Sequence, residues 1–246
     1  MQLIKFLFFL FLLTSQCFGA TSSVVFDSAD AGSPSGGSLT TITVSHTCTS
    51  KPNSYLGVFV VWLPSSSAIT SVKYNNVTMT NEITQADGAS SRSVGYWDLV
   101  NPSSGTNNIV LTFTTAGSGI GQLAGISFYN VNQTTPLFAT NKSSGTSNNP
   151  NVSITSAPWN FVVSSVGANG ASFVDTQDGT WNLFAPQSAG GTVNYVGYKS
   201  GSSISITRSD SLTLSKAWAA IIASIQPAVS FPKTFNNVQA NNMSVN

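Results

Sequence analysis

The stretch YLGVFVVWL, residues 55–63, is apolar at every position. Successive side chains of a β-strand point to opposite faces, so a strand with one wet face carries polar residues at alternate positions. This stretch carries none, and its branched and aromatic residues favour a strand over a helix. It therefore predicts a strand in the middle of a β-sandwich, covered on both faces.

Elsewhere in the chain, short runs of the same residue types are separated by Gly, Pro, Asn and Ser clusters, which is typical of antiparallel strands and turns. In KYNNVT, Asn75 and Asn76 suit a tight hairpin turn. The Ala-rich run 216–225 could pass for a helix, but Pro227 and its Ile and Trp content favour a core strand. The other predicted strands are 23–26, 39–47, 71–74, 77–80, 92–100, 108–114, 121–131, 151–155, 160–167, 180–185, 192–199 and 202–207.

This pattern predicts an all-β fold, an antiparallel two-sheet jelly-roll sandwich with extended terminal segments. We expect a single domain over residues 21–228. The Gly/Ser-rich stretch 30–38 reads as a connector after the first strand. The polar stretch 141–151 is either a domain boundary or a loop between two halves of one jelly roll, and we favour the loop.

The first twenty residues, MQLIKFLFFLFLLTSQCFGA, have a basic residue, a short apolar run and small residues at the end. This is typical of a secretory signal peptide, since the apolar run is too short to span a bilayer. Cleavage after Ala20 or Gly19 suits the pattern. We expect an extracellular protein, secreted or at the cell surface, with no membrane insertion.

Charged residues make up only 7% of the chain, with nine basic and eight acidic side chains. A nucleic-acid partner needs a basic face, so none is expected. A nearly neutral surface offers little repulsion against self-association. Without the signal segment Cys48 is the single cysteine, and we expect it to be a small buried residue.

Several segments, in this order, resemble a widespread group of secreted or surface-exposed jelly-roll proteins of environmental microbes and phages, over about residues 22–228. They are SHT, SVKYNNVTMT, YWDLVNPSSGTNNIVLTF, ISFYNVNQTTPL and WAAIIASIQPA. Most members of the group have no assigned activity, and the group includes subunits of extracellular filaments that join by strand exchange. The resemblance implies a jelly-roll fold and supplies no catalytic motif.

Catalytic groups are scarce. His46 shares the inward face of its strand with Ile42 and Val44, which favours a core histidine over a general base. Glu82 is the only glutamate, and Asp87 or Asp98 would have to complete a carboxylate pair for glycoside hydrolysis. We expect no enzyme, no catalytic residue and no obligatory cofactor.

A calcium site is an open alternative in the loop FVDTQDGTW, where Asp175 and Asp178 offer hard oxygen ligands. Asp27 and Asp30 form a second pair of this kind. Aspartate is also a common turn former, and we favour that reading for both pairs.

Exposed aromatic rings can stack on sugars. Trp97 and, best of all, Trp181 with Tyr195 and Tyr198 are the candidates for carbohydrate binding. Sequons for N-glycosylation, if the source has the machinery, begin at Asn76, Asn132, Asn141, Asn151 and Asn242.

Residues 229–246 extend past the last predicted strand. Strand alternation places Val229, Phe231, Lys233 and Phe235 on one face, and Val238 follows. An isolated strand cannot bury these side chains alone, so the segment is a candidate donor strand for a neighbouring subunit. A disordered or self-packed end is the alternative, and TSSVVF (21–26) is a second possible donor.

Together these observations predict a secreted, non-enzymatic structural subunit of an extracellular filament or surface layer. Its partner would be a second copy, joined head-to-tail by β-strand exchange into a linear or helical homopolymer. The alternative is a carbohydrate-binding or adhesive module, with or without calcium.

Overall fold

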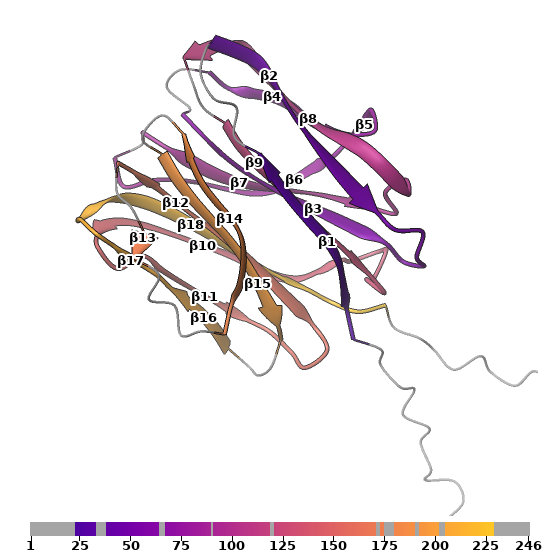
Figure 1. The fold of residues 1–246 in the computed structure, drawn as a ribbon. Coiled ribbons are helices and arrows are strands. Elements are labelled where there is room, and N and C mark those ends of the chain that lie inside the picture. Colours follow the sequence, from indigo (N-terminus) through magenta and orange to yellow (C-terminus); the bar gives the residue numbers. More distant parts are fainter. Residues whose placement is uncertain are drawn as a thin grey trace, which may run out of the picture.

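The computed structural model describes residues 23–32, 38–63, 67–89, 91–118, 121–170, 173–174, 180–189, 192–201 and 205–228. Throughout these residues the regular structure is β, and every strand pair is antiparallel (Figure 1). The all-β, antiparallel sandwich expected from the sequence is confirmed. The same residues contain no helix of a length and hydropathy that could cross a membrane.

The N-terminal half of the chain forms two sheets. We call the five-stranded one central sheet 1; its order is β1 (Val25–Gly32), β9 (Gly121–Tyr129), β3 (Tyr55–Trp62), β7 (Ser93–Val100) and β6 (Thr80–Ala86). Outer sheet 1 has the order β2 (Ser38–Cys48), β8 (Gly105–Ser118), β4 (Ile69–Tyr74) and β5 (Val77–Thr78). Chain segments alternate between the sheets, as in a jelly roll.

The C-terminal half repeats this strand order. Central sheet 2 has the order β10 (Leu137–Ser147), β18 (Lys216–Ile225), β12 (Phe161–Asn169), β15 (Thr192–Ser200) and β14 (Asn182–Ala189). Two short pairs, β11 (Asn151–Thr155) with β16 (Ser205–Ser209) and β13 (Phe173–Val174) with β17 (Ser211–Leu212), cover its outer side. Each strand of central sheet 2 thus matches the strand at the same place in central sheet 1, and the described residues form more sheets than the expected two.

The stretch 141–151 is mostly not a loop, contrary to expectation. Residues 141–147 belong to β10, and their polar side chains suit its place at the edge of central sheet 2. The segment that joins the two halves is instead 130–136, between β9 and β10.

Three apolar cores hold the layers together. The two central sheets share one core, outer sheet 1 packs on central sheet 1 around a second, and the short pair β11 and β16 closes a third over central sheet 2. Strand β3 lies between two of these cores. Its Phe59 and Val61 point into the first core, and its Val58 and Val60 point into the second. All eight residues of β3 are buried, as the opening stretch predicted.

Candidate functional site

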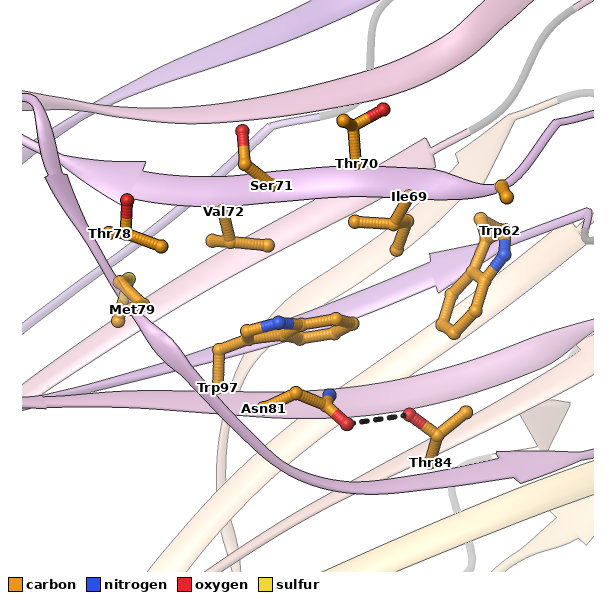
Figure 2. Close-up of a pocket in the computed structure, with 11 residues that line it drawn as sticks. Trp62, Ile69, Thr70, Ser71, Val72, Thr78, Met79, Asn81, Thr84 and Trp97 are labelled. Atoms are coloured by element: carbon orange, nitrogen blue, oxygen red, sulfur yellow. Dashed lines mark hydrogen bonds between the residues drawn. The ribbon is translucent and has the colours of Figure 1, made fainter.

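A groove of about 500 Å³ opens between the two sheets of the N-terminal half (Figure 2). Its apolar lining comes from the strands on either side. Ile69 and Val72 of β4 face Trp97 of β7 across the space, and Trp62 lies at one end. The remaining lining residues are Ala68, Thr70, Ser71, Thr78, Met79, Asn81 and Thr84. None of the lining residues is charged, so the groove suits an apolar or neutral polar ligand.

The groove exists because the chain changes sheets at Met79. Strand β5 ends at Thr78 as the last strand of outer sheet 1, and β6 begins at Thr80 as the last strand of central sheet 1. Strand β5 pairs with only Lys73 and Tyr74 of β4. The edge of outer sheet 1 is therefore left short.

The outer edge of β4 is consequently open over part of its length. The Met79 N–H still donates to the Val72 carbonyl at 2.9 Å. Within the described part of the chain, Ile69 and Ser71 pair only with β8, on the other side, and Thr70 is an extra residue at a shift of register between them. Unpaired N–H and C=O groups at a strand edge are a template for another strand.

Two tryptophans form the floor of the groove. The rings of Trp62 and Trp97 meet edge to face, with centroids 6.1 Å apart and planes at 62°. Gly95 lies beneath them, and a Cβ atom there would collide with the Trp97 ring and meet Trp62 at 3.2 Å. Only a glycine therefore leaves the two indoles room to lie over the sheet.

The far wall is strand β6, the edge of central sheet 1. Its register shifts between Asn81 and Ile83, so Glu82 is an extra, bulged residue. The Asn81 amide donates to the Tyr96 carbonyl at 3.4 Å, and the Thr84 hydroxyl donates to Asn81 Oδ1 at 3.4 Å (Figure 2). The bulge shapes this wall and directs Glu82 out of the regular alternation.

Glu82 and Asp98 lie together at this bulge. Burial, followed by the nearby Glu82 carboxyl, raises the pKa of Asp98 to about 7. Tyr55 also hydrogen-bonds Asp98, and its hydroxyl lies 2.9 Å from the Tyr96 hydroxyl. The structure thus brings together Glu82 and Asp98, one of the two carboxylate pairs considered for glycoside hydrolysis. Asp87, the other possible partner of Glu82, instead accepts hydrogen bonds within its own turn, from Ala89 and Ser91.

The opposite edge of the N-terminal sandwich is closed by polar contacts between β1 and β2. His46 Nδ1 lies 2.8 Å from Asp30 Oδ2. Asp27 accepts hydrogen bonds from the Thr49 N–H at 2.9 Å and the Thr49 hydroxyl at 2.6 Å, and from Ser127 at 3.0 Å. We call Asp27, Asp30, His46 and Thr49 the β1–β2 clasp.

Ser28 makes the clasp resemble a Ser–His–Asp triad in composition. Its hydroxyl lies 3.4 Å from His46 Nε2, but it donates to the Thr47 carbonyl at 2.5 Å. His46 is 1% exposed, and burial lowers its pKa despite the opposing effect of Asp30. A nucleophile needs its proton directed to an accessible base, so this arrangement favours a structural role. The prediction that His46 lies on the inward face of its strand is confirmed. Nothing in the sequence indicated that Ser28 and Asp30 would lie beside it.

The aromatic residues considered for carbohydrate binding are not gathered on one surface. Trp181 is only 8% exposed, and Lys199 and Arg208 approach its ring at 5.4 and 5.6 Å. Tyr195 and Tyr198 lie three residues apart on β15 and so point to opposite faces. Tyr198 stacks on Phe26, with centroids 4.7 Å apart.

Four of the sequon asparagines fall on described residues. Asn76 is exposed at the β4–β5 turn, where Asn75 and Asn76 have the positive φ angles, 45° and 65°, that the sequence predicted for this turn. Asn132 accepts two backbone hydrogen bonds, from Thr134 and Thr135. The side-chain amides of Asn141 and Asn151 donate to the carbonyls of Ser153 and Asn149. Asn76, Asn141 and Asn151 are exposed, whereas Asn132 is half-buried.

Several predicted features lie outside the described residues. They are the signal segment 1–20, Asp175, Asp178, Val229, Phe231, Phe235, Val238 and Asn242. Among the residues that are described, no three His, Cys, Asp or Glu side chains gather in a way that could hold a metal ion. Asp27 and Asp30 are both engaged in the clasp.

No family model matches this sequence, and no curated protein matches it.

Proposed function

We propose that this protein is a secreted, non-enzymatic structural subunit of an extracellular filament or surface layer, and that it assembles head-to-tail by β-strand exchange. The observation that carries the proposal is the half-open N-terminal sandwich. An apolar groove about 500 Å³ in volume runs beside a strand edge whose backbone groups are unpaired in the described residues. A strand from another subunit would bury the groove and complete the sheet at once.

The charge balance supports self-association. Nine basic and eight acidic side chains in 246 residues give subunits little net repulsion. Burial of three apolar side chains of a donor strand contributes roughly 4.5–9 kcal/mol, while association costs an estimated 4–15 kcal/mol. A durable polymer therefore also depends on backbone pairing and on contacts between the bodies of adjacent subunits.

A carbohydrate-binding module is the second candidate, and the same groove favours it. Two indole rings and the Asn81 amide line one open space, and Ser71 and Thr78 border it. Aromatic rings with a few polar groups form a common arrangement for small ligands. In this case a soluble glycan, rather than a protein strand, would fill the groove.

Electron microscopy and light scattering of residues 21–246 and 21–228, each from a secreting host, test the first candidate. Filaments from the longer chain and monomers from the shorter are the expected result. Monomers from both, together with glycan binding that quenches the Trp62 and Trp97 fluorescence, would replace the structural role with the carbohydrate-binding one.

A further inference from the structure

Both ends of the described chain lie at one pole of the molecule. The Asn130 side-chain amide donates to the Ser23 carbonyl at 2.8 Å, and the Ala228 N–H donates to the Asn130 carbonyl at 2.8 Å. Figure 1 shows the start of β1 and the end of the yellow C-terminal segment close together. The groove lies toward the other end of central sheet 1, where Trp62 pairs with Ser93 and Gly121.

The N-terminal candidate donor is already used within its own subunit. Val25 and Phe26 pair with Tyr129 and Phe128 of β9. The Val24 N–H donates to the Trp159 carbonyl at 3.0 Å, and the Phe26 ring stacks on Tyr198. Releasing TSSVVF would break central sheet 1, which leaves the C-terminal segment as the donor.

From these observations, and resting on the proposed function, we infer that residues 229–235 of a second copy occupy the groove and pair with the outer edge of β4. The pairing would be antiparallel, as are all strand pairs in the described residues. Phe231 and Phe235 would then enter the space over Trp97 and Trp62. Phe231 lies three residues after Ala228, at most about 10 Å away when extended, so the end of one subunit must lie directly beside the groove of the next.

Pro232 fits this placement. In an antiparallel strand, adjacent residues direct their backbone N–H and C=O groups to opposite sides. Phe231 and Lys233 can therefore pair with β4 while Pro232, which has no N–H, faces away from it. Proline is tolerated at such an edge and prevents a further strand from adding. The Lys233 stem is long enough to carry its ammonium group to the groove mouth.

Engineered cysteines test the site without changing the groove interior. Thr70 borders the groove, but its side chain is exposed and points away from the groove interior (Figure 2). The Ser230 and Thr234 side chains of a donor strand would lie on the same outer face. Cross-strand neighbours of this kind are close enough for a disulfide. Thr70→Cys in one full-length chain is mixed with Ser230→Cys or Thr234→Cys in another. The native Cys48 is buried and present in every sample.

Thr43→Cys is the matched control, because Thr43 is an exposed residue at the opposite edge of the same outer sheet. We expect a covalent two-chain species from Thr70→Cys with at least one tail variant, at least tenfold more abundant than with Thr43→Cys. If filaments form but Thr70→Cys cross-links to the tail variants no more than Thr43→Cys does, the groove is not the acceptor. The proposed strand-exchange function would not be affected by that result. Monomers in which Thr70→Cys and Thr234→Cys of one chain cross-link to each other would overturn the second copy as occupant. Monomers with neither cross-link would overturn both proposals.

Discussion

Glu82, the extra residue of the β6 bulge, hydrogen-bonds Asp98 of the neighbouring strand β7. Burial and this second carboxyl raise the pKa of Asp98 to about 7, against about 3.8 for an unperturbed aspartate. The folded protein therefore binds a proton between pH 4 and pH 7 that the unfolded chain releases. Its stability falls as pH rises through that range.

Asp98→Asn should remove this pH dependence. From pH 4 to pH 7, the unfolding free energy of the wild type should fall steadily relative to that of the variant. Above pH 7 the difference should level off, and urea denaturation measures it. Glu82→Gln is the control, because removing the second carboxyl should shift the transition to lower pH without abolishing it. Parallel curves for wild type and Asp98→Asn would show that Asp98 does not titrate in this range.

The β1–β2 clasp predicts the opposite slope. Burial lowers the pKa of His46 below 6.5. The unfolded chain therefore takes up a proton at a higher pH than the folded protein, and stability is lost as pH falls below about 6.5. His46→Gln should remove this loss. Asp30→Asn should lower the His46 pKa further, since Asp30 raises it, and nuclear magnetic resonance titration of the imidazole would detect the shift. An unchanged pKa would show that the 2.8 Å contact has no electrostatic effect.

Arg208 and Asp210 form an ion pair in the C-terminal half, with Nε and Oδ2 2.8 Å apart and both side chains buried. Asp210→Asn leaves the guanidinium without its opposite charge and should cost about 3–5 kcal/mol in unfolding free energy. Replacing both, with Arg208→Met and Asp210→Leu, should cost less than either charge removal alone. Chemical denaturation of Arg208→Met, Asp210→Leu and the double variant, each compared with wild type, measures the coupling. Additive losses would mean that the two charges do not stabilise each other.

Trp159 has a φ of 79°, and its side chain is 55% exposed. It follows Pro158 in a turn closed by the Asn160 N–H and the Ala157 carbonyl at 3.2 Å. Such a φ costs a bulky residue about 1–3 kcal/mol relative to glycine. Trp159→Gly should therefore raise the melting temperature by a few degrees, whereas Trp159→Ala, which keeps the strain, should not. A lower melting temperature for both would show that the indole stabilises the fold.

The donor segment makes a direct prediction about assembly. Each buried phenylalanine contributes about 1.5–3 kcal/mol, so Phe231→Ser with Phe235→Ser should weaken association at least a hundredfold. Thr234→Ser, on the other face of the same segment, is the matched control and should assemble normally. The critical concentration for filament formation, from light scattering, separates the two. Equal values would exclude the rings as anchors.

Periodicity predicted most of the strands, but it missed β6 and β10 and did not show which sheet each strand joins. The apolar run of β3, the turn at Asn75 and the core strand β18 were all evident, because each depends on residues next to one another. The groove depends on a change of sheet at Met79, inside the single strand predicted at residues 77–80, and nothing local marks it. In the clasp, Asp30 meets His46, which is 16 residues later in the sequence, and Ser28 approaches the same ring. The polar strand β10 has the composition of a loop.

The place of β18 sets how the molecule would respond to a pull on its C-terminal segment. This strand lies between β10 and β12 in central sheet 2, and it is paired with both along most of its length. Tension applied beyond Ala228 would act along the strand axis, so the hydrogen bonds on both sides would share the load in shear instead of opening one after another. A chain of such subunits would resist stretching at every link through its own central strand, and we expect the junctions between subunits to part before the subunits unfold.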